Sequence, residues 1–308
     1  MVLIELAAAL PKEFPASVLI VQHIGAHRST LPELLTERGR LPAIHPRTGQ
    51  ALQHGTIYIA PPDHHMLVVD GMIRLTREAK ENHARPAIDP LFRSAAIAQG
   101  PRVIGVILSG RLDDGTAGLQ AIKACGGLAV VQDPDDAQEP SMPTSACANV
   151  AVDHQVTRAN LVDTLVKLVN QTAQPAPVAP KPLVCEHSLS IGEGDAMELL
   201  DSIGKPSKIV CPDCNGVLWE LTGSMPPRYR CHTGHAFTQR SLEYTQGVRA
   251  DEALWNALRA LEERERLLRD FARTSRERGN ESEASRLETE AEHAQTHATQ
   301  LKRIVGRD

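Results

Sequence analysis

Residues 101–118 read PRVIGVILSGRLDDGTAG. The run 103–108 is continuously apolar and rich in β-branched residues, which is typical of a strand buried on both faces of a parallel sheet. Asp113 and Asp114 follow it, and a helix is expected from about Thr116. We expect one of the two acids to cap the free N–H groups at the start of that helix. The alternative is a chemical role, because open α/β sheets bind their ligands at the carboxyl ends of the strands.

Strands and helices alternate on both sides of this stretch. Strands are expected at 18–22, 57–60, 66–69, 72–75, 103–108 and 128–132. Helices are expected at 2–10, 31–38, 91–98, 116–124, 141–150 and 160–170. Asp70-Gly71 predicts a hairpin turn between two of the strands. This alternation predicts an α/β fold with a doubly wound, mostly parallel sheet.

Composition divides the chain into four parts. The α/β part covers 1–170, and the Pro- and Ala-rich segment 171–182 is a linker. A small zinc-ribbon-like module is expected at 183–240 and an α-helical hairpin at 241–308. In the last part, leucines and alanines recur at helical spacing on both sides of Gly279, which predicts an antiparallel helical hairpin or a coiled-coil oligomer. The second alternative would let the chain self-associate.

The overall composition excludes several classes of partner. The chain has 308 residues, of which 42% are hydrophobic but only 3% aromatic, so its core must be aliphatic. A net charge of -5 argues against nucleic acid and anionic membrane surfaces as partners. No basic segment opens the chain as in a signal peptide, and no apolar run approaches the roughly 20 residues of a membrane span. We therefore expect a cytoplasmic protein without membrane insertion.

Half of the six cysteines lie in a metal-binding pattern. Cys211 and Cys214 form a C-x-x-C pair, and Cys231 and His235 form a second pair. Zinc prefers four nitrogen or sulfur ligands in a tetrahedron, and this spacing supplies them. His232 is a rival for the fourth position, and a remnant site without metal is the alternative. Because four protein ligands leave no open position, we expect one structural zinc and no cofactor for catalysis.

A histidine and an acid form the second chemical pattern. His23 directly follows the strand expected at 18–22, and Asp114 follows the strand expected at 103–108. Both would lie along the same edge of a parallel sheet, where acyl-transfer sites combine a base, an acid that orients it and a nucleophile. Arg85 and Asp89 are expected to form a salt bridge at the entrance of the helix at 91–98.

Four stretches together resemble a known family. They are QHI at 22–24, TIYIAPPDHH at 56–65, RPAIDPLFRSAA at 85–96 and LSGRLDDGTAGL at 108–119. Their order and spacing over about residues 1–150 are similar to the catalytic domain of the CheB-type protein-glutamate methylesterases of bacterial chemotaxis. The resemblance implies a Ser-His-Asp triad that hydrolyses glutamate methyl esters on methyl-accepting chemoreceptors and releases methanol. His23 would be the general base and Asp114 the acid that orients it. A receptor methyltransferase is a further candidate partner.

No residue of this sequence matches the nucleophile of the family. The family carries it in a GxSxGG-like turn ahead of the first helix, whereas the first serine here is Ser17, before the strand that leads to His23. Ser109 is the nearest alternative, but it shares a loop with Asp114. Because an orienting acid binds the imidazole on the side away from the nucleophile, this position does not suit a nucleophile. Arg111 also stands where typical members carry methionine, and no receiver domain is expected in these residues.

The missing nucleophile leads us to expect that residues 1–308 alone are inactive. Three explanations are a start site assigned too late, which we favour, a truncated fold and a degenerate esterase. The competing interpretation is a catalytically dead module that binds receptors or another partner.

Overall fold

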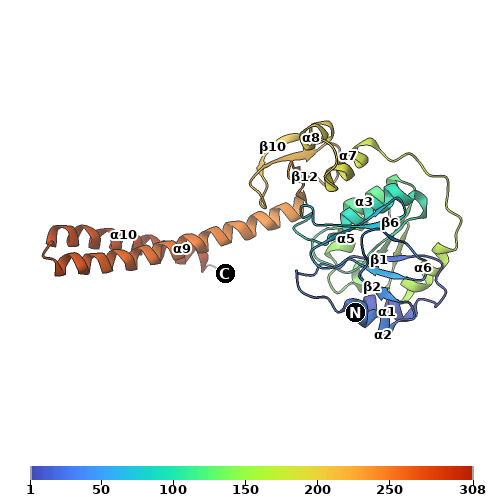
Figure 1. Cartoon of the computed structure of the whole chain (residues 1–308), viewed down its shortest axis with the longest axis horizontal. Coiled ribbons are helices and arrows are strands. Elements are labelled where there is room, and N and C mark those ends of the chain that lie inside the picture. The colour runs from blue at the N-terminus through green and yellow to red at the C-terminus, as the bar shows by residue number, and fades with distance from the viewer. Residues whose placement is uncertain (1, 307–308) are drawn as a thin grey trace. The chain divides into compact units, whose positions relative to one another are not determined.

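The computed structural model describes residues 2–306 (Figure 1). The chain divides into two compact units, Met1–Leu242 and Glu243–Asp308. Among residues 2–306, no helix is both long enough and apolar enough to cross a lipid bilayer.

Helices and strands alternate through the first part of the first unit. Its helices are α1 (Val2–Ala9), α2 (Leu31–Arg38), α3 (Ile88–Gln99), α4 (Thr116–Ala124), α5 (Ser141–Asn149) and α6 (Leu161–Val169). Its strands are β1 (Val18–Ile20), β2 (Ala43–Ile44), β3 (Gln50–Ala51), β4 (Ile57–Ile59), β5 (His65–Val69), β6 (Met72–Thr76), β7 (Ile104–Ile107), β8 (Leu128–Gln132) and β9 (His154–Val156).

The strands of this part form three small sheets. Parallel strands pair in the orders β1-β4-β2 and β7-β8-β9, and antiparallel strands pair in the order β3-β6-β5. The hairpin predicted at Asp70-Gly71 is present and joins β5 to β6. The predicted α/β fold with parallel sheets is therefore confirmed, with the parallel strands of the described residues divided between two sheets.

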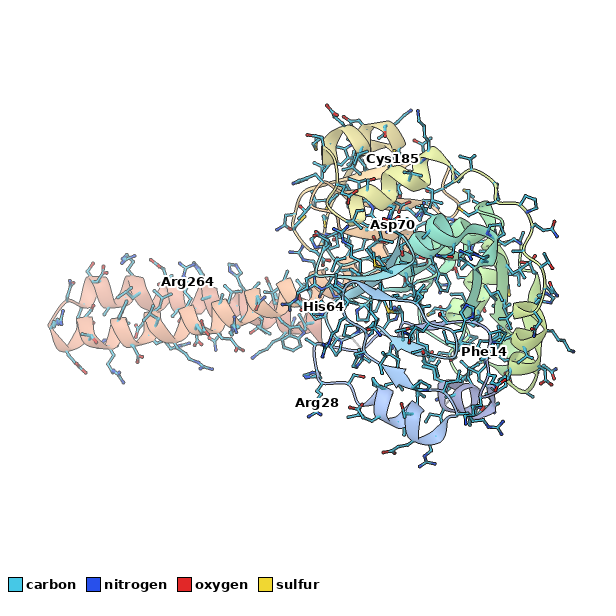
Figure 2. All side chains as sticks on the ribbon, turned by 45° about the vertical axis from the view of Figure 1, so that its right-hand side comes forward. Phe14, Arg28, His64, Asp70, Cys185 and Arg264 are labelled. Carbon is cyan, nitrogen blue, oxygen red and sulfur yellow. The ribbon has the colours of Figure 1, made fainter. Side chains whose placement is uncertain are left out.

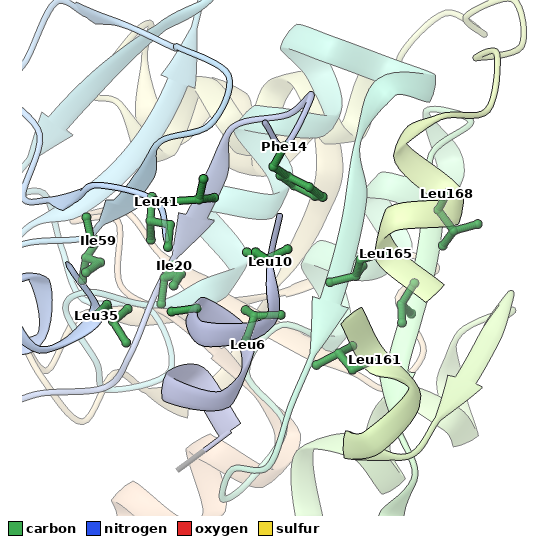
Figure 3. Close-up of a cluster of buried hydrophobic side chains, with 14 residues drawn as sticks. Leu6, Leu10, Phe14, Ile20, Leu35, Leu41, Ile59, Leu161, Leu165 and Leu168 are labelled. Atoms are coloured by element: carbon green, nitrogen blue, oxygen red, sulfur yellow. The ribbon is translucent and has the colours of Figure 1, made fainter. Parts of the chain in front are cut away.

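Aliphatic side chains hold the first helices against the first parallel sheet (Figure 3). Leu6 and Leu10 from the α1 region pack with Ile20 of β1. Helix α6 buries Leu161, Leu165 and Leu168, whose spacing of four and three places them on one helical face. Phe14 is the aromatic member of this cluster, so the core here is mainly aliphatic, as its composition requires.

The first unit continues through a small antiparallel sheet. Two helices lead into it, α7 (Lys181–Ser190) and α8 (Ala196–Ile203). Its strands pair in the order β10-β11-β12-β13, with bounds Gly204–Val210, Val217–Leu221, Arg228–Cys231 and Ala236–Thr238. One compact unit contains both this module and the α/β part. The predicted domain boundaries at 170, 182 and 240 stay predictions.

Two long helices account for the second unit. Helix α9 (Gln239–Glu277) begins in the first unit and runs into the second, where α10 (Glu281–Val305) follows it. Gly279 lies between them with φ of 80°, a left-handed conformation that glycine adopts readily. Buried leucines and alanines line the seam: Leu258, Leu268, Ala272, Ala284, Leu287, Ala291, Ala294 and Ala298. The predicted helical C-terminal region is confirmed.

The seam of the helical unit can be tested with Leu258→Asp. Leu258 is 4% exposed, and burying an unpaired carboxylate there opposes the small stability of a helical hairpin. We expect residues 249–308 with this change to lose most of their helical signal in far-ultraviolet circular dichroism. The matched control is Leu267→Asp on the same helix, where the side chain is 52% exposed and the signal should persist. Equal helicity in the two variants would show that the seam is misassigned.

Candidate active site and metal centre

His23 and Asp114 are in direct contact. His23 follows β1, and Asp114 lies in the loop between β7 and α4. The Nε2 atom of His23 is 2.6 Å from Oδ2 of Asp114. The Asp114 side chain is 3% exposed and that of His23 is 37% exposed. The buried acid can therefore hold the imidazole while part of the ring faces the outside.

Asp114 also binds the first turn of α3. Its Oδ2 accepts a hydrogen bond from the N–H of Ile88 at 2.7 Å, and its Oδ1 accepts one from the N–H of Asp89 at 3.2 Å. Such N–H groups lack partners inside the helix and stabilise negative charge. Burial raises the pKa of Asp114, but the hydrogen bonds from His23, Ile88 and Asn82 outweigh it and hold the pKa below its usual value. The carboxylate is therefore ionised at neutral pH.

Asp89 performs the reciprocal function for α4. Its Oδ1 accepts hydrogen bonds from the N–H groups of Gly115 at 3.0 Å and Gly118 at 2.6 Å. A Cβ atom on Gly118 would lie 3.1 Å from the Cα of Asp89 and closer still to Phe92, so glycine permits this approach. Burial and the charge of Asp114 raise the pKa of Asp89 well above its usual value.

Two expectations about these acids are wrong. Neither Asp113 nor Asp114 caps α4 with its side chain, because Gly115 occupies the cap position and Asp89 approaches from the neighbouring helix. Arg85 also does not pair with Asp89. Its Nη2 lies 2.7 Å from Oδ1 of Asp63 instead, because Asp89 points toward α4.

The environment of His23 suits a base. Burial lowers its pKa, but the hydrogen bond to Asp114 and the charges of Asp114 and Asp89 raise it, and the net direction is upward. Because Nε2 faces Asp114, Nδ1 is the nitrogen that remains for proton transfer. Within residues 2–306, no hydrogen bond to that nitrogen is found.

A cavity of about 1600 Å³ lies beside His23. Its walls include 18–23, which contains β1, and residues of β7, and parts of α1 and α6 also line it. Both β1 and β7 end their sheet orders, so in the described chain each has one edge without a strand partner. The cavity therefore lies between the free edges of two parallel sheets.

The two serines considered as nucleophiles are engaged elsewhere. Ser17, at the amino end of β1, donates its hydroxyl to the carbonyl of Gln53 at 3.0 Å. Ser109 lines the cavity, but its Oγ accepts a hydrogen bond from the N–H of Glu139 at 2.9 Å. The described hydrogen bonds therefore place neither serine hydroxyl on His23.

The predicted metal ligands gather at one end of the antiparallel sheet. Donor atoms of Cys211, Cys214, Cys231 and His235 all lie within 4.8 Å of one another. The Sγ atoms of Cys214 and Cys231 are 3.6 Å apart, and Sγ of Cys231 is 3.6 Å from Nδ1 of His235. Bonds of about 2.3 Å to a tetrahedral zinc give sulfur–sulfur edges of about 3.8 Å. The arrangement fits one zinc ion.

Backbone turns build the two ligand pairs. In the first, the N–H of Asn215 donates to the carbonyl of Cys211 at 2.8 Å, and in the second the N–H of Gly234 donates to the carbonyl of Cys231 at 2.9 Å. The Oδ2 atom of Asp213 lies 3.9 Å from Nε2 of His235, which is close enough for charge attraction but too long for a hydrogen bond.

Two nearby residues lie outside the group of donors. His232 packs against Gly216, where a Cβ atom would come within 2.8 Å of its ring. Cys185 belongs to α7 (Figure 2), and its Sγ lies 3.9 Å from the hydroxyl of Ser202.

An α/β domain with a histidine and a buried carboxylate in contact at the ends of parallel strands presents two groups that a hydrolytic enzyme can use as a base and an orienting acid. A family model described as CheB methylesterase matches residues 1–165. The chain therefore belongs to the CheB methylesterase family.

Individual relatives agree with this assignment. A Leptospira interrogans protein named "Putative protein-glutamate methylesterase/protein-glutamine glutaminase" is 35% identical over 161 residues, which are 52% of this chain and 83% of that protein. A "Protein-glutamate methylesterase/protein-glutamine glutaminase 2" from Methanosarcina mazei is 32% identical over 174 residues, 54% of this chain and 47% of that protein. The crystal structure of the Thermotoga maritima CheB methylesterase catalytic domain superposes with a TM-score of 0.52 at 29% identity, covering 55% of this chain and 92% of that one.

The contact between His23 and Asp114 predicts a pH-dependent effect. Folding raises the pKa of His23, so the pair adds stability that is complete below the unfolded value of about 6.5 and is lost as the pH rises through the folded value. Asp114→Asn should lower the pKa of His23, because burial remains while the charge is removed. An NMR titration of the histidine ring signals measures this pKa, and the signal that disappears in His23→Gln identifies His23.

The matched control for this titration is Asp113→Asn. Asp113 is the neighbouring buried acid, and it binds the hydroxyl of Thr238 rather than His23. This substitution should change the pKa of His23 only slightly, since asparagine keeps an acceptor for the hydroxyl of Thr238. An unchanged His23 titration in Asp114→Asn would contradict the pairing in solution.

Proposed function

We propose that this chain is the catalytic part of a cytoplasmic protein-glutamate methylesterase acting on methyl-accepting chemoreceptors. The observation that carries the proposal is the 2.6 Å contact between His23 and the buried Asp114 in a domain of the CheB methylesterase family. The substrate is the methyl ester of a glutamate side chain, and the products are the free carboxylate and methanol.

The roles of the two residues follow from their contacts. A serine hydroxyl attacks the ester carbonyl while Nδ1 of His23 accepts its proton, and Asp114 stabilises the resulting imidazolium. The imidazolium then gives this proton to the departing methoxide, which leaves as methanol. In a second step water attacks the acyl-enzyme while His23 accepts a proton from it, and His23 then gives this proton to the departing serine oxygen. Asp114 holds the ring in place throughout through its bond to Nε2.

The serine in this mechanism belongs to a Gly-rich turn that follows a strand, and this strand would fill the cavity between β1 and β7. Protein interiors are close-packed, so a partly open cavity of about 1600 Å³ beside His23, lined by residues of β1, β7 and α6, favours an additional element there. A parallel strand would bond to the free edges of β1 and β7 and join the two sheets into one doubly wound, mostly parallel sheet. Its carboxyl end would reach the edge where His23 and Asp114 meet.

Residues 183–240 form a zinc-ribbon-like module in this proposal. Cys211, Cys214, Cys231 and His235 would hold one zinc ion, and the proposal is supported by donor atoms that all lie within 4.8 Å of one another. Four protein ligands leave no position for substrate or water, so this zinc is structural.

Methanol release from methylated receptor tests the esterase. Residues 1–308 alone should release none, and a chain extended at its N-terminus by a β-strand and a Gly-rich turn with serine should release it. In the extended chain, His23→Ala and Asp114→Asn should each lower the rate by about 10³-fold or more, because such residues act as a unit.

Ser17→Ala is the matched control in the extended chain, because the hydroxyl of Ser17 donates to the carbonyl of Gln53 rather than to His23. Its rate should equal that of the unchanged extended chain. Turnover by residues 1–308 that survives His23→Ala would overturn the assignment of the base. An extended chain that binds receptor without releasing methanol would instead support the dead binding module.

Elemental analysis tests the metal site. Purified protein should contain about one zinc per chain, and Cys214→Ser should lose it because a ligand is removed. Cys185→Ser is the matched control, since Cys185 lies outside the donor group and its loss should leave the zinc bound. Wild-type protein purified without chelator and free of zinc would contradict the proposal.

A further inference from the structure

Asn82 connects the candidate catalytic acid to residues 204–241, which contain the strands β10 to β13 and the first turn of α9 and which we call the C-terminal module. Its Nδ2 donates to Oδ1 of Asp114 at 3.0 Å and to Oδ2 of Asp89 at 2.9 Å. Its Oδ1 accepts from the N–H of Thr238 at 3.1 Å and from the hydroxyl of Ser241 at 2.9 Å. A side-chain amide has two donors and accepts two hydrogen bonds, so these contacts use its full capacity.

The four contacts permit one orientation of the amide. Turning it over would place its oxygen against two carboxyl groups and its NH₂ group against the N–H of Thr238. Thr238 and Ser241 are 156 and 159 residues further along the chain. Residues from β13 and the first turn of α9 therefore determine which atom of Asn82 faces Asp114.

The backbone of Asn82 is held from the same side. Its N–H donates to the carbonyl of Ala236 in β13 at 2.7 Å. Its φ is 51°, in the left-handed region that non-glycine residues occupy only with support from their surroundings. The C-terminal module thus supports both the conformation and the side-chain orientation of Asn82.

We propose that Asn82 is a positioning residue of the esterase centre, and that Thr238 and Ser241 orient it so that the C-terminal module aligns Asp114 with His23. The proposal rests on the proposed catalytic function of His23 and Asp114. The N–H of Ile88 donates to Oδ2 of Asp114 at 2.7 Å. Among residues 2–306, Oδ1 has, besides Asn82, only the longer 3.2 Å contact from the N–H of Asp89. Without Asn82 the carboxylate can rotate, and Oδ2 leaves its contact with Nε2.

Further contacts make the connection rigid. The hydroxyl of Thr238 donates to Oδ1 of Asp113, the residue before the acid, at 2.7 Å. Glu81, the residue before Asn82, lies 2.6 Å from the guanidinium of Arg230 on β12 and 2.5 Å from that of Arg93 on α3. Arg230 is 0% exposed, so this ion cluster is shielded from water. If the module moves, it therefore pulls on the acid loop at two places, Glu81-Asn82 and Asp113-Asp114.

The NMR titration of His23 tests the proposal without any need for turnover. The charged groups that face His23 are Asp114, from the loop before α4, and Asp89, from α3. Asn82→Gly removes the amide and keeps a left-handed backbone. If Asn82 positions Asp114, the pKa of His23 falls toward its value in Asp114→Asn. If Asn82 affects only the charge of Asp114, that acid becomes more basic, the pKa of His23 rises or stays, and the proposal is overturned.

Ser241→Ala supplies a second variant with an intact Asn82. It removes one of the two donors to Oδ1 of Asn82 and should lower the pKa of His23 less than Asn82→Gly does. If Ser241 acts through Asn82, adding Ser241→Ala to Asn82→Gly produces no further shift. Additive shifts would show that Ser241 acts by another route and would overturn this part.

Ser224→Ala is the matched control within the module. Ser224 also makes hydrogen bonds there, to the carbonyl of Leu221 and from the N–H of Arg228, but has no contact with Asn82. Its loss should leave the His23 titration unchanged. A shift equal to that of Ser241→Ala would show that general loosening of the module, rather than the orientation of Asn82, is responsible.

Methanol release by the extended chain gives an independent readout. Ser241→Ala should lower kcat about tenfold with KM unchanged, because a misaligned acid affects proton transfer rather than binding. If no chain releases methanol but the His23 titrations behave as expected, the positioning stands and the esterase proposal fails. If methanol is released and both variants leave the pKa of His23 and kcat unchanged, the positioning fails alone.

Discussion

The exchange of carboxylates between α3 and α4 is the interaction on which the site depends. Asp114 binds the first N–H groups of α3, and Asp89 of α3 binds the first N–H groups of α4. The start of α3 is therefore bound by an acid from the loop before α4, and the start of α4 is bound by an acid of α3. Because both acids are buried, any change in the distance between the helices leaves a buried group without its partner, which is costly. The position of Asp114 is thus fixed by the packing of two helices.

The same arrangement shifts the pKa values of the two acids in opposite directions. Hydrogen bonds from several donors, including His23, hold the pKa of Asp114 below its usual value, whereas burial beside that charge raises the pKa of Asp89. The charge of Asp114 is stabilised by its donors and disfavours a second charge beside it. The glycines of the DDGTAG stretch, Gly115 and Gly118, allow the approach that produces this difference.

Local patterns of the sequence predict much of this structure. The helices Leu31–Arg38 and Thr116–Ala124 and the strand Leu128–Gln132 occur with the expected bounds, because apolar spacing and turn residues act over a few positions. Strands such as Ala43–Ile44 were not predicted, since two residues carry no periodic pattern. His23 and Asp114 both follow expected strands, but it was the resemblance to the CheB-type family that paired them as base and acid. Asp89, Asn82 and the cluster of Glu81 with Arg230 depend on contacts between distant segments, and composition and spacing give no signal for them.

Asn82 makes hydrogen bonds across the linker that composition predicts at 171–182. The proline-rich segment suggests two independent bodies, yet the residues that complete the hydrogen bonding of Asn82 come from beyond it. His235, a member of the proposed metal group, precedes Thr238 by three positions, and Ala236 between them holds the backbone of Asn82. The turn that carries His235 therefore leads directly into the strand that supports Asn82. The strand of three residues, Ala236–Thr238, belongs to the sheet of the module and also supports Asn82, so the folding of the module and the position of Asp114 depend on the same strand.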